Sequence, residues 1–112
     1  MRDADAARDR IFRALADPSR RAIFESLTQG EAAVKELTAR FDISQPAVSQ
    51  HLAALYGAGL VKRRREGRIV YYSVDPAALD PLIDWVTHYR VFWTDRIGRP
   101  ERLLEATDDE QC

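Results

Sequence analysis

Cysteine is almost absent from this chain, whose 112 residues include one, Cys112, at the last position. A single thiol excludes an internal disulfide and fits a reducing compartment. No stretch approaches the roughly 18–20 apolar residues of a membrane-spanning helix, and no signal-peptide pattern is present. We therefore expect a cytoplasmic protein with no membrane partner.

Groups that carry catalysis are also scarce. The chain has two histidines, His51 and His88, and neither a glycine-rich phosphate loop nor a cluster of metal ligands stands out. An enzyme needs one of these, or a nucleophile beside a base. Asp84 and His88 come nearest to a dyad, and nothing indicates a pocket around them. The sequence therefore indicates a protein that is not an enzyme and uses no cofactor.

A large net charge is lacking as well, because 17 basic and 18 acidic side chains give a formal net charge of −1. The distribution is uneven. Residues 35–74 carry seven basic and three acidic side chains, whereas residues 75–112 carry four basic and nine acidic ones. This pattern favours a nucleic-acid contact through one patch over indiscriminate coating of nucleic acid.

Two helices are expected before this basic segment. In the first, four apolar residues share one face: Ala7, Ile11, Phe12 and Leu15. Asp17 suits the N-cap of the second helix, with Pro18 in its first turn. Arg20 and Arg21 follow in that turn, where local ion pairs and a phosphate contact are both open to them.

Residues 34–56 read as a helix, a tight turn and a second helix. Apolar residues repeat at helical spacing in both halves: Val34, Leu37 and Phe41, then Val48, Leu52 and Leu55. Ser44 suits the N-cap of the second helix, and Pro46 fits its first turn, where the missing N–H is harmless. We expect each helix to bury one face.

The outward face of the second helix carries small and polar groups: Gln45, Pro46, Ser49, Gln50 and Ala53. Glutamine pairs bidentately with adenine in the major groove, and serine bonds bases or phosphates. We take Gln45, Ser49 and Gln50 as candidate base readers, with Pro46 shaping the helix start. The alternative is an ordinary solvated helix face.

Residues 60–74 read as a β-hairpin that turns at Glu66-Gly67, because β-branched and aromatic residues dominate its second half. Its first half and turn are basic: Lys62, Arg63, Arg64, Arg65 and Arg68. Such side chains bind a phosphate backbone, since each neutralised phosphate releases counterions. The alternative is a solubilising sheet edge, because Lys and Arg also protect edges.

A long helix is expected over residues 76–97, opened by Asp75-Pro76 and followed by a short tail at 98–112. Its apolar residues cover about half of the circumference, more than packing on one core requires. Aromatic residues are enriched in protein interfaces. We therefore expect a dimer interface at six positions: Leu82, Trp85, Val86, Tyr89, Trp93 and Ile97.

Segments 14–27, 44–52 and 58–74, together with the terminal helix, resemble the ArsR/SmtB family of bacterial winged-helix repressors. The combination is more specific than any of its parts, and it covers roughly residues 8–97. The resemblance implies a cytoplasmic homodimer that binds an operator near its own promoter and blocks transcription. It also points to the terminal helix, together with the first helix, as the dimer surface. Many members of the family release DNA when a metal ion or another effector binds.

The metal sites of the family are not matched here. Metal-sensing members typically place a Cys pair on the first helix of the helix-turn-helix, where this chain has Ala33 and Lys35. A second family site uses Asp and His of the terminal helix, for which Asp84, His88 and Asp95 are the candidates. Their face should point to solvent, so we expect no metal site and leave the effector unknown.

The sequence thus predicts one domain over residues 1–112, mostly α with a small β-hairpin, in a winged helix-turn-helix fold that is dimeric through terminal helices. The helix-turn-helix spans 34–56, the wing 60–74, and the dimerisation helix 76–97. The predicted function is a repressor on an inverted-repeat operator of double-stranded DNA. The alternatives are a metal-responsive repressor with a site on the terminal helix, and a winged-helix protein-interaction module.

Overall fold

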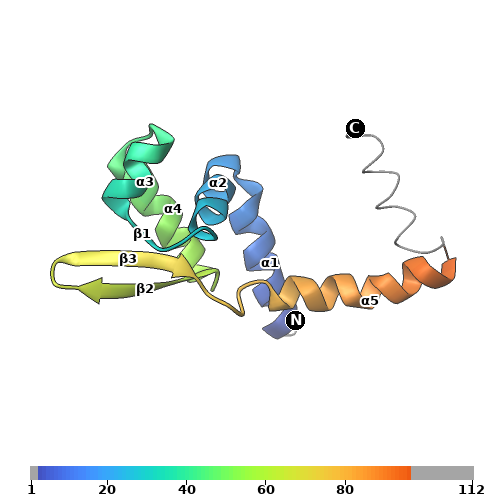
Figure 1. Ribbon diagram of the computed structural model, residues 1–112. Coiled ribbons are helices and arrows are strands. Elements are labelled where there is room, and N and C mark those ends of the chain that lie inside the picture. Colours follow the sequence, from blue (N-terminus) through green and yellow to red (C-terminus); the bar gives the residue numbers. More distant parts are fainter. Residues whose placement is uncertain (1–2, 97–112) are drawn as a thin grey trace. The chain divides into compact units, whose positions relative to one another are not determined.

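The structure, a computed structural model, describes residues 3–96. Its elements are α1 (Asp3–Ala16), α2 (Pro18–Leu27), β1 (Ala32–Ala33), α3 (Val34–Phe41), α4 (Gln45–Gly57), β2 (Val61–Glu66), β3 (Ile69–Val74) and α5 (Asp80–Arg96) (Figure 1). The chain divides into two compact units between Pro81 and Leu82. This element order confirms the predicted fold class of a mostly α chain with a winged helix-turn-helix; dimerisation stays a prediction.

Capping side chains set the helix starts as predicted. The Asp17 carboxylate accepts hydrogen bonds from the backbone N–H groups of Ser19 and Arg20, at 2.9 and 3.1 Å, and opens α2. These hydrogen bonds, the one to Arg20 first, lower the pKa of Asp17. Ser44 accepts from the N–H of Ala47 at 3.2 Å and opens α4. Between α3 and α4 the chain turns through Asp42, whose φ of 51° is left-handed, a conformation that Asp tolerates better than most residues.

Seven fully buried side chains from α1, α2, α3, α4 and the start of the wing form the core of the first unit: Ile11, Ile23, Leu37, Val48, Leu52, Leu55 and Leu60. Three of them belong to α4, which packs against α1, α2, α3 and β2. The core therefore holds α4 by one face and leaves its opposite face outward.

The wing is part of a three-stranded antiparallel sheet in the order β1-β3-β2. Arg64 pairs with Tyr71 across β2 and β3. The hairpin turns at Gly67 and Arg68, one residue later than the predicted Glu66-Gly67, because Glu66 still pairs with Ile69, and Gly67 supplies the positive φ, 61°, of the turn. Strand β1 was not predicted. With only Ala32 and Ala33 in it, the strand is too short for any alternation of apolar and polar residues to show in the sequence.

The predicted start of the terminal helix at Pro76 is wrong, because α5 begins at Asp80. Asp75 instead closes a turn, in which its side chain accepts from the N–H of Ala77 at 2.9 Å. Pro81 explains the shift. In a helix starting at residue 76 or 77 its ring would clash with a carbonyl one turn earlier, whereas near the N-terminus of α5 it is tolerated.

Helix α5 exposes large apolar side chains: Ile83, Trp85, Val86, Tyr89, Val91, Phe92 and Trp93. Its aromatic rings contact one another edge to face, with centroids 5.2 Å apart for Trp85 and Tyr89 and 6.1 Å apart for Phe92 and Trp93. Leu82 is half-buried, and Ile97 lies outside the described residues. Between residues 3 and 96, no helix combines the length and apolar character needed to cross a bilayer.

Candidate nucleic-acid interface

The outward face of α4 is as the sequence predicted. Gln45, Pro46, Ser49 and Gln50 are all exposed, whereas Val48, Leu52 and Leu55 are fully buried on the other side. We call these four exposed residues the reading face. They lie at the N-terminal end of α4, where the helix dipole and free N–H groups favour an approaching phosphate.

The wing exposes its basic side chains along the whole of β2 after Val61. β2 contacts α4, and β3 contacts α3 (Figure 1). Successive strand residues point to opposite sides of the sheet, so Lys62 and Arg64 lie on one side and Arg63 and Arg65 on the other. The five predicted phosphate contacts therefore do not form one surface.

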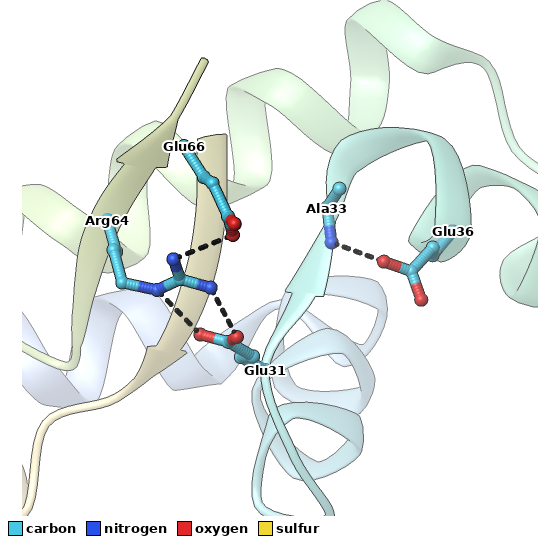
Figure 2. A network of polar contacts seen from close by, with 5 residues as sticks. All are labelled: Glu31, Ala33, Glu36, Arg64 and Glu66. Atoms are coloured by element: carbon cyan, nitrogen blue, oxygen red, sulfur yellow. Dashed lines mark hydrogen bonds and ion pairs between the residues drawn. The ribbon is translucent and has the colours of Figure 1, made fainter. Parts of the chain in front are cut away.

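Arg64 is engaged by two carboxylates, as Figure 2 shows. Its Nη2 lies 2.7 Å from Oε1 of Glu31, and its Nη1 lies 2.9 Å from Oε2 of Glu66. A longer contact of 3.4 Å joins its Nε to Oε2 of Glu31, which makes the pair bidentate. The guanidinium also lies over the Tyr71 ring, 4.8 Å from its centroid. Arg64 thus ties the wing to the segment that leads into β1.

The pKa values of this cluster shift as its geometry requires. The hydrogen bond from Arg64 lowers the pKa of the Glu31 carboxyl. The hydrogen bonds from Glu31 and then Glu66 raise the pKa of Arg64. All three side chains are exposed, so solvent screens the interaction and limits what it adds to stability.

Arg63 makes a second link. Its guanidinium carbon lies 4.0 Å from the ring centroid of Tyr56, in the last turn of α4. Cation–π contacts at exposed sites are weak but directional. The base of the wing is thereby tied to the helix that carries the reading face.

Lys62, Arg65 and Arg68 differ from these two. All three are exposed, and within residues 3–96 their charged ends have neither a hydrogen-bond nor an ion-pair partner. Arg65 precedes the last residue of β2, and Arg68 lies in the hairpin turn. Lys62, Arg65 and Arg68 are available to neutralise phosphates, because no carboxylate has neutralised them already. Arg63, over the neutral Tyr56 ring, also keeps its charge, but that contact holds its side chain at the base of the wing.

The role of Glu31 was not predicted from the sequence. Nothing near it in the chain marks it, because its partner Arg64 lies 33 positions away and meets it only through the unpredicted pairing of β1 with β3. Glu36, by contrast, has a partner close in sequence: its side chain accepts from the N–H of Ala33, three positions earlier, at 3.1 Å (Figure 2). That contact places Ala33 at the start of α3.

The candidate metal positions do not form a site in the part of the chain that the structure describes. Lys35 and, on α5, Asp84, His88 and Asp95 are exposed. No group of three or more His, Cys, Asp or Glu side chains among residues 3–96 is arranged to hold a metal ion. His51 is half-buried on α4, and its Nδ1 is shielded from solvent without a hydrogen-bond partner.

A helix-turn-helix whose second helix exposes a polar face beside a basic wing defines a winged-helix DNA-binding protein. Residues 17–63 match the model of the bacterial regulatory protein family named arsR. The chain is 41% identical, over 91% of its length and 92% of the relative's, to the HTH-type transcriptional regulator Rv2034 of Mycobacterium tuberculosis. It is 33% identical to the transcriptional repressor SdpR of Bacillus subtilis, over 70% of this chain and 88% of the relative.

Solved structures agree with this assignment. An ArsR-like transcriptional regulator from Rhodococcus sp. RHA1 superposes with a TM-score of 0.73 at 28% identity, covering 82% of this chain and 87% of the other. The chain belongs to the arsR family of bacterial regulatory proteins. It is a DNA-binding transcriptional regulator and not an enzyme.

Proposed function

We propose that the protein is a repressor that binds, as a homodimer, an inverted-repeat operator of double-stranded DNA in the cytoplasm. One observation carries this proposal: the exposed reading face of α4 and the unpaired wing cations belong to one compact unit. The Arg63–Tyr56 and Arg64–Glu31 contacts link the wing to the rest of that unit. The relative SdpR is named a transcriptional repressor, which supports repression over activation for this chain.

In this proposal, α4 enters the major groove. Gln45, Ser49 and Gln50 face the base edges, and Pro46 shapes the helix start. Arg65 and Arg68, at the hairpin turn, contact the phosphate backbone or the minor groove, and Lys62, on the opposite side of β2 from Arg65, is a third cation available to a phosphate. Arg63 and Arg64 hold the wing in place, and the two carboxylates on Arg64 reduce the charge that it brings to the DNA contact. Of the five wing contacts predicted from the sequence, this proposal keeps Lys62, Arg65 and Arg68 as DNA contacts and gives Arg63 and Arg64 a role in placing the wing.

The dimer interface that we propose is the apolar face of α5, formed by Leu82, Trp85, Val86, Tyr89 and Trp93. The exposed aromatic residues of this helix support the assignment, because large exposed apolar patches are characteristic of association sites. Ile97, the sixth position predicted from the sequence, lies outside the described residues. A two-fold dimer carries two reading faces and therefore selects two half-sites.

Selection of bound sequences from random DNA tests the proposal. We expect an inverted repeat whose half-site centres are about 34–36 Å apart, one helical turn, or a multiple of that. Gln50→Ala should cost about 1–3 kcal/mol on the selected site and much less on random DNA. Arg65→Ala should weaken both similarly and reduce the salt dependence by about one charge.

Two outcomes would count against the proposal. If no sequence is enriched and random DNA does not bind in a salt-dependent way, a protein-interaction module becomes the better interpretation. If Gln50→Ala weakens selected and random DNA equally, Gln50 is not a base reader.

A further inference from the structure

A shallow hollow of about 190 Å³, broadly open to solvent, lies where α1, α2 and α4 meet. Its lining includes three arginines of α1 and α2, two small residues of α4 and the residue that caps it: Arg10, Arg13, Arg20, Ala54, Gly57 and Ala58. We call it the arginine hollow. The small residues leave the space open on the α4 side. A Cβ added to Gly57 would meet no heavy atom within 4 Å.

The arginines of the hollow have no ion-pair partner among the described residues, although the charge of Arg20 acts on the nearby Asp17 carboxylate and contributes to its lowered pKa. No carboxylate is among the residues that line it. Within residues 3–96, the guanidinium groups of Arg10, Arg13 and Arg20 form neither an ion pair nor a hydrogen bond. Their neighbours differ: Arg8 lies 3.5 Å from a carboxylate oxygen of Asp5, and other arginines of the unit donate to carbonyl or hydroxyl oxygens.

Arg20 gives a second, independent observation. Its Nε is shielded from solvent and has no hydrogen-bond partner. A shielded charged donor without an acceptor is unfavourable, so folded proteins normally supply one. The adjacent carboxylate of Asp17 is occupied by the backbone N–H groups of Ser19 and Arg20. Because the Nε itself is shielded, an acceptor from outside the chain would have to meet the Arg20 guanidinium through its Nη groups.

We propose that the arginine hollow binds a small anion that carries at least two carboxylate or phosphate groups. Guanidinium groups bind both kinds of oxyanion bidentately. Three of them around one space favour a ligand with several negative oxygens over a ligand with a single charge. The space also exceeds the volume of about 30 Å³ that one water molecule occupies in the liquid, so it admits an organic acid or phosphate compound of a few carbon atoms.

The position of the hollow makes it regulatory, a consequence that rests on the proposed DNA-binding function. The first turns of α4 carry the reading face, and its last turns line the hollow. A bound anion adds negative charge to the unit that approaches DNA phosphates, and it bridges α1 and α2 to α4. The anion therefore weakens DNA binding, and by linkage DNA weakens anion binding by the same factor.

Calorimetric titration of the full chain with citrate and, separately, with inorganic pyrophosphate at constant ionic strength tests the site. At least one of them should bind about one per chain with a submillimolar Kd. Arg13→Gln and Gly57→Leu should each weaken this binding by about tenfold or more. Gly57→Leu fills the space without removing a charge, and Arg10→Gln is a second charge variant. Circular dichroism verifies that each variant is folded.

The matched control is Arg90→Gln, which removes the same charge from an exposed position of α5. It should leave anion binding unchanged. Binding of citrate alone identifies a carboxylate ligand, and binding of pyrophosphate alone identifies a phosphate ligand. The proposal is overturned if neither anion binds at millimolar concentration, or if Arg90→Gln weakens binding as much as Arg13→Gln does.

DNA binding by the same preparations separates this site from the proposed function. Without added anion, Arg13→Gln should bind DNA like the wild type. A loss as large as that of Arg65→Ala would mean that Arg13 contacts DNA phosphates, and the anion site would be wrong. A chain that binds DNA but neither anion refutes only the site. A chain that binds an anion but no DNA refutes only the proposed function.

Discussion

Five basic side chains lie between positions 62 and 68 of the wing, and their neighbours give them different roles. Arg64 is neutralised by Glu31 and Glu66, and Arg63 lies over Tyr56. The other three have no partner among the described residues. A cation that is already paired releases fewer counterions when it meets DNA. Counting charges in the sequence therefore overestimates the number of phosphate contacts.

The Glu31–Arg64 pair also predicts how stability depends on pH. The pKa of Glu31 is lowered in the folded chain, so the folded state favours its ionised form. This contribution to the free energy of unfolding is fully present above the unfolded pKa, about 4.3. It is lost as the pH falls through the lower, folded pKa. Glu31→Gln should therefore be less stable than the wild type at pH 7, with a difference that shrinks below about pH 4.

Denaturant unfolding at a series of pH values measures this difference. Glu25→Gln is the matched control. Glu25 is exposed and lies outside the Arg64 cluster, so the substitution removes the same charge without touching that cluster. A Glu31→Gln deficit of the same size at pH 7 and pH 3.5, on the acid side of a free Glu, would contradict the ionic interpretation. The loss would then come from packing or from the hydrogen bond alone.

At the scale of elements, helix caps and apolar periodicity were enough to predict α2, α3 and α4, and β-branched and aromatic content predicted the β2–β3 hairpin. Each of these carries its signal within a few residues, such as Ser44 and Pro46 at the start of α4. The start of α5 was missed because Asp75-Pro76 and Asp80-Pro81 offer the same signal twice. Strand β1 was missed because its two residues become a strand only by pairing with β3.

The reading face could be predicted because helical geometry alone decides which residues of α4 lie opposite the buried ones. The division among the wing cations could not. It depends on the register that brings Glu31 to Arg64 and on the contact between β2 and α4 that brings Arg63 to Tyr56. Such distant partners leave no local pattern in a single sequence.

The Glu31–Arg64 contact should hold the wing in a fixed position for DNA binding. Both Glu31→Gln and Arg64→Gln should weaken DNA binding, because a less constrained wing loses more conformational freedom on binding. Neither should lower the salt dependence by a full charge, in contrast to Arg65→Ala. Fluorescence anisotropy on one duplex at several salt concentrations measures both quantities. Tighter binding by Glu31→Gln would mean instead that Glu31 competes with phosphate for Arg64.

At the scale of the whole molecule, the exposed face of α5 requires an explanation. Trp93 is 40% exposed and Phe92 48%, on a helix that begins at the boundary between the two units. Water-exposed aromatic surface of this kind favours association, at roughly 25 cal/mol for each Å² buried. Residues 75–112 carry an excess of acidic side chains, which DNA phosphates would repel. The exposed face of α5 therefore suits a protein partner better than DNA.

A charge on this face should therefore dissociate the protein. We expect Trp93→Glu to be monomeric at micromolar concentration and to lose operator binding, since one half-site alone binds weakly. Thr87→Glu adds the same charge at another exposed position of α5 and should leave the dimer intact. Sedimentation velocity without DNA distinguishes the two variants. A wild-type chain that sediments as a stable monomer would contradict the proposed homodimer.

The last prediction concerns metal ions as effectors of the whole regulator. Zinc sites in proteins use about four closely placed Cys, His or carboxylate ligands, and arsenite requires thiolates. The chain offers one thiol, Cys112, and two imidazoles, of which His51 is half-buried on α4 and His88 is exposed on α5. Lys35, at the position that resembles a family ligand site, would repel a cation. We therefore expect DNA binding to be indifferent to zinc, cadmium, nickel and arsenite at low micromolar free concentration.

Calorimetric titration of the protein with zinc, without DNA, shows whether the protein has a zinc site, and DNA affinity measured with and without each metal tests the indifference. The result that would overturn the prediction is a submicromolar site, at one or two ions per dimer, that disappears in His88→Ala. Two symmetry-related His88 side chains, completed by Asp84 or Asp95, would form such a site if the α5 helices of a dimer crossed to bring them together. An unchanged affinity for DNA, with no zinc site, leaves an anion at the arginine hollow as the effector to be tested next.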